Sequence, residues 1–484
     1  MKKYFACVLV LAFLMSMIFI PSCSNNDELA PTGEGQPSLV SDSPSEEITE
    51  ESYYDKLGSR DFEGDSFVIL HVGERSGMFY SGEEFTGEPI KDASLTRDRL
   101  IEDLYNVKIE YVYRDYETLS NVLQSSAATG EHLYDMVIAS IITLSSPAQN
   151  NLLHNMASMP YLSLDSPWWS KLIFENMTFN GKLFSTAGDI FPGMYMAPAA
   201  MYVNRKLLQD HGITENLYDL VFSGKWTFEV LERLTKDMDM DLNQDGKMRD
   251  IDDFFGFIHQ NHTLSSNMFC AAVGLKLSTI RDNAIALDLT SQNAIEKIER
   301  LSDFFKQINY SGVNDIITDT FHGGKAIFLA HYLESSFLFL RDMEDDYGIL
   351  PMPKYDEAQQ SYISLLNPWN SSSVGVPLLV DPDKVGFLME AMGYASYDLI
   401  RPNVYELTLK TKFARDSDSA RVIDLIIETS YLDLNCVYDF GGSTESVRNA
   451  IFDKKPLVSA IEAKEGTIQK AIDKFIDNIS VPAG

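Results

Sequence analysis

Side chains that carry oxygen recur in the stretch DLNQDGKMRDID, which spans residues 241–252. Calcium binds six to eight oxygen ligands, and a calcium-binding loop needs a glycine at its sixth position for a sharp turn. When Asp241 is counted as the first position, Gly246 is the sixth. The spacing therefore predicts a calcium site with ligands from Asp241, Asn243, Asp245, the backbone carbonyl of Lys247, and Asp252.

Two features of this loop depart from the usual pattern. Asp252, at the twelfth position, is shorter than the usual bidentate glutamate, and Arg249 occupies the ninth position, where an acid or a water is expected. The alternative interpretation is a solvated acidic turn that holds no ion. The sequence offers no partner loop of the same kind, which argues against a paired calcium sensor.

Residue patterns typical of common hydrolases do not occur in the sequence. There is no His-Glu-x-x-His, no Cys-x-x-Cys and no Gly-x-Ser-x-Gly. His259 and His262 lack further ligands for zinc, and the segment 323–326 (GGKA) lacks the Ser or Thr of a phosphate-binding loop. A glycosidase needs only two carboxylates, which sequence spacing does not reveal among 71 acidic residues. We expect a protein that is not an enzyme, with a secreted hydrolase as an alternative.

The N-terminus has the pattern of a secretory signal. Lys2 and Lys3 precede the apolar run 4–20, which is short for a membrane span. The following Pro21-Ser22-Cys23 resembles the end of a bacterial lipoprotein signal, which implies that residues 1–22 are removed and that Cys23 carries the lipid, including palmitate. The alternative is a retained N-terminal anchor helix.

The next segment, 23–55, reads as a lipid anchor followed by an acidic tether. Residues 24–52 contain eight acids, three prolines, no Lys or Arg and no aromatic residue. Such a segment cannot bury enough apolar surface to offset its ordering entropy, so we expect it to be disordered. The alternative is an acidic interaction tail. We expect the protein at the extracellular face of the cell membrane, attached through its lipid only.

Charge and cysteine usage narrow the class of protein further. The formal net charge is −32, and it becomes −34 without Lys2 and Lys3. A strongly acidic body argues against nucleic-acid binding and against direct adhesion to anionic lipid. Cys270 and Cys436 are the cysteines left after the lipid site, and two buried free thiols are favoured over one disulfide.

Apolar periodicity predicts alternating strands and helices in the first part of the folded body. Strands are expected at 67–72, 107–113 and 134–140, with helices at 94–106 and 116–128. This alternation is typical of a mostly parallel sheet covered by helices.

The pattern then becomes more mixed. We expect a hairpin around Asn180-Gly181, a strand that runs into a helix at 201–209, and a strand at 347–353. Helices are expected at 227–237, 291–308, 384–399 and 417–430.

Several segments, in this order, resemble the extracellular solute-binding proteins of ABC importers, in particular the family 1, sugar-type lipoproteins. They include LIEDLYNVKIEYV, YDMV, PWWSKL, NGKLFSTAGDI, MYVNRKLLQDHGI, FHGGKAIF and DYGILPMPKYDEAQQSY. The resemblance covers roughly residues 62–475. It implies an α/β, two-lobed periplasmic-binding-protein-like fold (type II), with hinge strands between lobes that close on a ligand.

The chain of this family crosses between the lobes more than once. We therefore expect lobe one at 56–165 plus 318–363 and lobe two at 166–317 plus 364–484. The resemblance implies a monomer that captures a carbohydrate, most suitably an oligosaccharide, and delivers it to the membrane subunits of an ABC permease. It also implies that the calcium loop braces one lobe and takes no part in ligand binding.

Sugars present C–H faces and hydroxyl edges, which suit aromatic rings and polar side chains respectively. Trp369 lies in a loop rich in small polar residues next to an expected hinge, and tryptophans 168 and 169 lie in another turn-rich stretch. The expected ligand-binding residues are Trp369, Asp189, Trp168, Trp169, Tyr202 and Asn367. At least one of Trp168 and Trp169 is expected in the core. A peptide or another polar solute is the alternative ligand, and an adhesin without ligand-induced closure is a further alternative function.

Overall fold

The computed structural model describes the folded body of the chain. The described residues are 52–73, 82, 84–248, 252–281, 284–306, 311–312, 314–404 and 416–480. The predicted signal peptide, Cys23 and nearly all of the acidic tether lie outside them, so those expectations stay predictions. Within the described residues, no helix combines the length and the apolar character needed to cross a membrane.

The first sheet forms around the predicted apolar strand FVILHV. Its strand order is β12-β3-β1-β2. The strands β1, β2 and β3 are mutually parallel, and β12 pairs with β3 in the antiparallel direction. The four strands are β1 (Asp65–Val72), β2 (Val107–Arg114), β3 (Met136–Ser140) and β12 (Ser372–Gly375).

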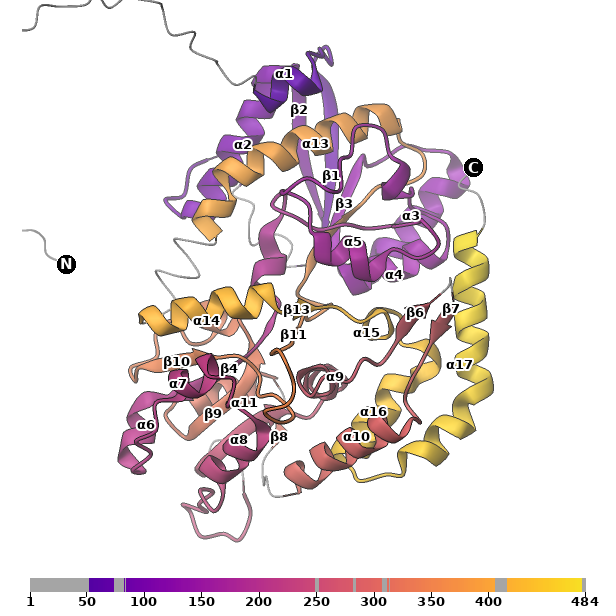
Figure 1. Ribbon diagram of the computed structural model, residues 1–484. Helices are drawn as coiled ribbons and strands as arrows, with labels where there is room; N and C mark the ends of the chain where they lie inside the picture. Colours follow the sequence, from indigo (N-terminus) through magenta and orange to yellow (C-terminus); the bar gives the residue numbers. More distant parts are fainter. Residues whose placement is uncertain are drawn as a thin grey trace, which may run out of the picture. The chain divides into compact units, whose positions relative to one another are not determined.

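Helices cover this sheet because their apolar faces continue its core. The helices α2 and α13 lie side by side along it (Figure 1). Gly386 lets α13 approach the carbonyl of Pro160, since an added Cβ would lie 2.0 Å from that oxygen. The helices packed on this first core are α2 (Pro89–Tyr105), α3 (Leu119–Thr129), α4 (Ile141–Gln149), α5 (Lys171–Met177), α13 (Pro382–Leu399) and α15 (Leu434–Tyr438), and the short α1 (Tyr53–Leu57) contacts α13.

The second sheet has the strand order β10-β4-β9-β5-β8. Its central strand β9 is parallel to β5 and antiparallel to β4, and β4 is antiparallel to β10. The strands are β4 (Ala199–Asn204), β5 (Phe255–Gln260), β8 (Ser311–Gly312), β9 (Ala326–Tyr332) and β10 (Tyr347–Leu350). Every residue of β4 and β9 is buried, so this sheet has helices on both faces.

Several helices around the second sheet begin at residues whose side chains cap the first turn. Thr227, for example, accepts a hydrogen bond from the backbone N–H of Val230 at the start of the helix that was expected at 227–237. The helices are α6 (Arg205–Asp210), α7 (Leu217–Phe222), α8 (Phe228–Thr235), α9 (Thr263–Ala272), α10 (Gln292–Phe305), α11 (Asn314–His322), α12 (Ser335–Leu338), α14 (Ser417–Glu428) and α16 (Ser443–Phe452).

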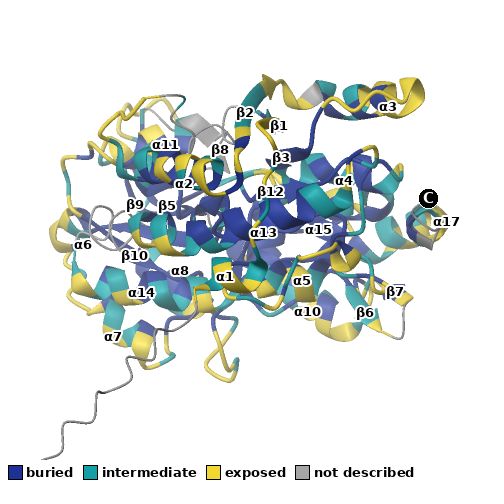
Figure 2. Ribbon diagram, turned by 90° about the horizontal axis from the view of Figure 1, so that it is seen from above, coloured by how far each residue is buried: buried dark blue, intermediate teal, exposed yellow. Residues whose placement is uncertain are grey.

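The remaining elements are small, apart from the last helix. Two short ribbons pair β6 (Thr279–Arg281) with β7 (Ala284–Ala286) and β11 (Ser364–Leu365) with β13 (Ser430–Tyr431). The helix α17 (Leu457–Ser480) begins against the core of the second sheet and ends against the core of the first. Buried residues concentrate in the interior around α13 and α15, and exposed residues lie on the outer loops and helix faces (Figure 2).

The two sheets have separate hydrophobic cores, and we call each sheet with its core a lobe. Segments that cross between them run side by side, since Thr186 pairs with Val374 and Pro198 pairs with Leu366. The crossing segment after Thr186 leads from the first core into β4, and the one after Leu366 leads back into β12.

Strand pairing and packing correct the expected lobe boundaries. The strands β9 and β10 fall within 318–363, which was expected in lobe one, but they belong to the second sheet. The strand β12 and the segment 168–191 were expected in lobe two, but they belong to the first sheet and its core. The sequence identifies these segments as apolar strands, but it does not specify which sheet each strand joins. That choice depends on which strands become neighbours in space.

Candidate functional site

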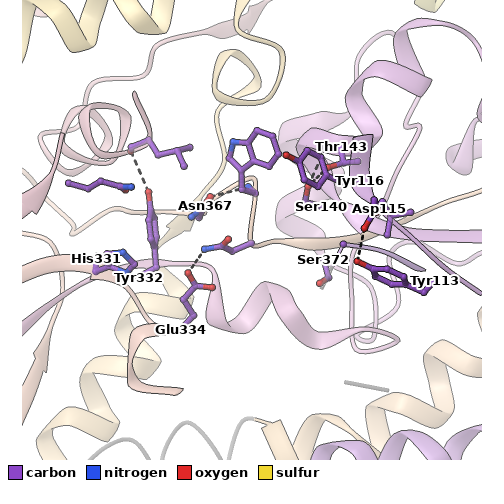
Figure 3. Close-up of a pocket in the computed structure, with 16 residues that line it drawn as sticks. Tyr113, Asp115, Tyr116, Ser140, Thr143, His331, Tyr332, Glu334, Asn367 and Ser372 are labelled. Atoms are coloured by element: carbon purple, nitrogen blue, oxygen red, sulfur yellow. Dashed lines mark hydrogen bonds between the residues drawn. The ribbon is translucent and has the colours of Figure 1, made fainter. Parts of the chain in front are cut away.

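A pocket of about 510 Å³ opens where strands of both sheets end. Most residues that line it follow or terminate β1, β2, β3, β5 and β9, at the carboxyl ends of these strands, and the others come from the loop before β12 and from its first residue, Ser372. Ligands of open α/β sheets bind at this edge. Figure 3 shows the two sets of side chains around the same space, with Tyr113, Asp115 and Tyr116 on one side and His331, Tyr332 and Glu334 on the other.

The first wall is built by the ends of β1 and β2. These strands are parallel and in register, with Val72 opposite Arg114, so the residues that follow them emerge together. Tyr113, Asp115 and Tyr116 are exposed and line the pocket. The hydroxyl of Tyr113 donates a hydrogen bond to Oδ1 of Asp115 at 3.1 Å, which orients both groups.

The end of β3 adds hydroxyl groups to this wall. Ser140 caps α4, and its Oγ accepts a hydrogen bond from the backbone N–H of Thr143 at 3.3 Å. The hydroxyls of Ser140 and Thr143 lie 2.7 Å apart, and both residues line the pocket. Ser372, in the neighbouring strand β12, supplies a further hydroxyl.

The second wall comes from β5, α9 and β9. Gln260 ends β5 and Leu264 lies in α9, while His331 and Tyr332 end β9 and Glu334 follows it. Glu334 is 5% exposed, and its Oε1 accepts a hydrogen bond from Nδ2 of Asn370. This contact joins the second wall to the loop that leads into the first sheet.

That loop, Asn367 to Ser371, is fixed by its own hydrogen bonds. Oδ1 of Asn367 accepts the backbone N–H of Trp369 at 3.0 Å, and the carbonyl of Asn367 accepts the N–H of Ser371 at 3.0 Å. The carbonyl of Ser371 in turn accepts the N–H of Ile141 in α4 at 3.1 Å. Trp369 therefore has a defined position in the pocket although it is 43% exposed.

Aromatic rings from separate segments meet in this pocket. The ring centroids of Tyr116 and Trp369 are 6.3 Å apart at a steep angle of 86°. The ring of His71, which does not line the pocket, lies 5.3 Å from that of Tyr113, and burial lowers the pKa of His71. The pocket thus combines aromatic surfaces with hydroxyl, amide and carboxylate groups.

Two of the six residues expected to bind ligand, Trp369 and Asn367, line this pocket. The structure places the other four in the interior, outside the pocket: Asp189, Trp168, Trp169 and Tyr202. Nε1 of Trp169 donates to Oε2 of Glu390 at 2.8 Å, so Trp169 packs in the first core.

Tyr202 packs against a residue that lines the pocket, whereas Asp189 lies in a segment that crosses between the lobes. The hydroxyl of Tyr202 lies 3.0 Å from the carbonyl oxygen of Tyr332, behind the second wall. Asp189 is fully buried in a crossing segment, where its Oδ1 accepts the hydroxyl of Tyr195 at 2.8 Å. Burial raises the pKa of Asp189 to about 6, against the opposing effects of the Tyr195 hydrogen bond and the charge of Arg401.

Sequence reasoning missed most of the lining residues, although a signal for them existed. Asp115 and Tyr116 lie two and three residues after the predicted strand 107–113, and Glu334 follows the apolar segment that becomes β9. Residues after parallel strands gather at one edge of a sheet. Reading polar and aromatic residues at these positions would have identified Asp115, Tyr116 and Glu334.

The predicted calcium loop has part of the expected turn. Gly246 has φ +76°, and its N–H donates to Oδ2 of Asp241 at 2.8 Å. Oδ1 of Asp241 is buried and has no hydrogen-bond partner among the described residues. The loop is closed at its base by mutual backbone hydrogen bonds between Met240 and Phe254.

Other features of the loop are less suited to an ion. Oδ1 of Asn243 accepts the N–H of Asp245 at 2.9 Å, and Oδ1 of Asp245 accepts the N–H of Lys247 at 2.8 Å. Across the described part of the chain, no three His, Cys, Asp or Glu side chains converge as a metal site. Residues 249–251 lie outside the described residues, so the calcium site stays a prediction.

The two remaining cysteines are confirmed as free and buried. Burial raises the pKa of the Cys270 and Cys436 thiols. Neither lines the pocket, and both belong to the core of the second lobe.

No protein-family model and no curated protein matches this sequence. Solved structures that resemble it include two from Listeria monocytogenes. The maltose-binding periplasmic protein MalE in complex with maltose has a TM-score of 0.52 and 15% identity, over 86% of this chain and 98% of that chain. An ABC substrate-binding protein in complex with cycloalternan has a TM-score of 0.53 and 11% identity, over 86% of this chain and 99% of that chain.

At these identities the likeness establishes the fold. The chain has the two-lobed, periplasmic-binding-protein-like α/β fold, and the predicted fold class is confirmed. Both of these solved structures are of binding proteins.

Proposed function

We propose that this protein binds a carbohydrate, most suitably an oligosaccharide, as the extracellular substrate-binding protein of an ABC importer. The observation that carries the proposal is the pocket at the carboxyl ends of both sheets, where the rings of Tyr113, Tyr116 and Trp369 lie among polar groups. The fold it shares with a maltose-bound and a cycloalternan-bound protein supports the same ligand class.

The chemistry of the lining residues suits a sugar. Aromatic faces pack against the C–H faces of pyranose rings, and hydroxyl, amide and carboxylate groups bond to their hydroxyl edges. Asn367, Asn370 and Gln260 offer amides, and Ser140, Thr143 and Ser372 offer hydroxyls. The volume of about 510 Å³ is within the usual range for small-molecule sites.

Closure of the two lobes would couple binding to transport. A ligand that contacts Tyr116 of one wall and Tyr332 of the other binds the closed arrangement more tightly than an open one, and so shifts the population toward closure. The closed form would then dock, as a monomer, on the two membrane subunits of the permease.

The attachment to the membrane rests on sequence alone. We propose that Cys23 carries the acyl chains, palmitate among them, and that the acidic tether holds the folded body at the extracellular face of the membrane. Labelling of cells with a palmitate analogue tests this. The wild-type chain should carry label, and Cys23→Ser should not; equal labelling of both would contradict the lipid site.

A structural calcium ion is a separate proposal. The ion would be held by Asp241, Asn243, Asp245, the carbonyl of Lys247 and Asp252. The buried Oδ1 of Asp241, which has no hydrogen-bond partner among the described residues, supports this proposal because it is available to coordinate an ion. The ion would neutralise clustered carboxylates and brace lobe two. Calorimetry should detect calcium binding that Asp241→Ala abolishes, and no binding below millimolar calcium would contradict the proposal.

A thermal-shift screen of the mature chain, residues 23–484, against oligosaccharides tests the main proposal. A ligand at 100 times its Kd adds about 2.7 kcal/mol to the free energy of unfolding, which is an easily measured shift. A response to peptides alone would favour a peptide-binding importer protein. Sugar cleavage in the same samples would favour a hydrolase. The absence of a thermal shift with every sugar and peptide would favour an adhesin.

A further inference from the structure

The charges that face the pocket have one sign. Two lining residues are carboxylic acids, Asp115 from the first wall and Glu334 from the second. Among the described residues that line the pocket, none is a lysine or an arginine. The arginine next in sequence, Arg114, directs its Nη1 to the carbonyl of Tyr113 at 2.8 Å and does not line the pocket.

Among the described residues that line the pocket, His331 is the one whose side chain becomes a cation when it is protonated. It is 2% exposed, and its Nδ1 lies 2.6 Å from Oγ of Ser335. This hydroxyl satisfies one ring nitrogen without requiring the charged form of the imidazole. The pocket therefore offers an anionic ligand no fixed cation on its described walls.

Because Glu334 is buried, the repulsion between its carboxylate and an anionic ligand is only weakly screened. Charges out of bulk water are screened less than exposed ones, and Glu334 is 5% exposed. The formal charge of the whole chain, −32, also makes the electrostatic potential around the protein negative. A ligand carboxylate, sulfate or phosphate placed between Asp115 and Glu334 meets repulsion from both walls, whereas sugar hydroxyls donate hydrogen bonds to the same carboxylates.

We propose that the pocket selects uncharged saccharides and discriminates against acidic ones. This inference rests on the proposed carbohydrate-binding function and specifies its substrate class. Neutral rings have hydroxyl donors for Asp115 and Glu334 and C–H faces for Trp369. Uronates, sulfated sugars and peptides with a free C-terminal carboxylate each bring an anion for which the described walls hold no cation.

Matched oligosaccharides that differ only in oxidation at C6 test the discrimination. The mature chain is titrated calorimetrically with oligomers of glucose, galactose and mannose, each against its uronate counterpart, at 20 mM and 500 mM salt. We expect a neutral oligomer to bind at least tenfold more tightly than its uronate, with a smaller ratio at the higher salt. Equal or tighter uronate binding overturns this inference and leaves carbohydrate binding intact, whereas binding of no oligomer overturns the proposed function itself.

Charge-neutralising variants locate the discrimination. Asp115 is exposed, so Asp115→Asn leaves folding unaffected and should reduce the neutral-to-uronate affinity ratio by about threefold or more, and adding Glu334→Gln should reduce it further. Glu462→Gln makes the same chemical change at an exposed position of α17 outside the pocket, and should leave the ratio unchanged. If Asp115→Asn and Glu462→Gln gave the same ratio, the pocket carboxylates would not be the source of selectivity.

Discussion

The side chain of Asn367 accepts a hydrogen bond from the backbone N–H of Trp369, with 3.0 Å between oxygen and nitrogen. The carbonyl of Asn367 also accepts the N–H groups of Asn370, at 3.1 Å, and Ser371. One residue thus holds the turn that presents the indole to the pocket. Because the turn is fixed before a ligand arrives, binding loses little conformational entropy at this position.

Trp369→Ala should weaken saccharide binding and leave the fold intact. We expect at least a tenfold loss of affinity, since an aromatic surface for a sugar face is removed. The free energy of unfolding should change by less than about 1 kcal/mol because Trp369 is 43% exposed and lies outside both hydrophobic cores. Calorimetry and urea unfolding measure the two quantities.

Phe174→Ala is the control for that variant. Phe174 is 37% exposed on α5 and does not line the pocket, so its removal should leave saccharide affinity at the wild-type value. Wild-type affinity in Trp369→Ala would remove this residue from the site.

Asp189 should make stability depend on pH. Burial raises its pKa in the folded state to about 6, above the value of 3.8 for a solvated aspartate. Because the folded state holds the proton on Asp189 more tightly than the unfolded state, protonation of Asp189 stabilises the fold. This stabilisation is complete below about pH 4 and is lost as pH rises through about 6. The free energy of unfolding of wild type relative to Asp189→Asn should therefore fall by about 1–3 kcal/mol between pH 4 and pH 7.

Asparagine is a suitable substitute because it still accepts the hydroxyl of Tyr195 and does not ionise. Urea unfolding of both proteins at pH 4.5, 5.5, 6.5 and 7.5 gives the comparison. A constant difference across this range would contradict the assignment to Asp189.

Tyr53 should secure the start of the folded body. Its hydroxyl donates to Oε1 of Glu390 at 2.7 Å, and Glu390 is fully buried. Tyr53→Phe removes a hydrogen bond to a buried acid and should cost about 1–2 kcal/mol of unfolding free energy. Tyr54→Phe, one residue away in α1, should change it by less than about 0.5 kcal/mol, and similar losses in both variants would contradict this role of Glu390.

Two helical glycines should respond to alanine in opposite directions. An added Cβ at Gly386 would lie 2.0 Å from the carbonyl oxygen of Pro160, so Gly386→Ala should cost about 1–3 kcal/mol. Gly466, in α17, has no neighbour within 4 Å of an added Cβ, and Gly466→Ala should add about 0.4–1 kcal/mol. Thermal unfolding of the two variants would contradict the packing of α13 if Gly386→Ala were as stable as wild type.

Individual helices, strands and turns could be predicted from the sequence because apolar periodicity and turn residues are properties of short segments. The strand β1, the helix α14 and the turn at Asn180-Gly181 all lie where they were predicted, and both turn residues have positive φ. The start of α2 was placed at Ser94, but Glu88 caps a helix that begins at Pro89. A proline at the first helical position is a start signal that the apolar pattern alone does not contain.

The site was harder to predict because burial and strand order are not local properties. Tyr202 and Trp169 are of residue types that often contact sugars. In this protein, however, the hydroxyl of Tyr202 donates to the buried carbonyl of Tyr332, and Nε1 of Trp169 donates to the buried Glu390. Trp369 was found because its loop is rich in small polar residues. Asp115 and Glu334 lie 219 positions apart in the sequence, and only the pairing of the strands places both at one pocket.

Calorimetric titration of the mature chain with neutral oligosaccharides tests the central claim most directly. Wild type should bind at least one of them in a 1:1 ratio, and Trp369→Ala should bind the same sugar at least tenfold more weakly while Phe174→Ala matches wild type. Absence of binding by every oligosaccharide, or a sugar affinity that is identical in all three proteins, would contradict carbohydrate capture in this pocket.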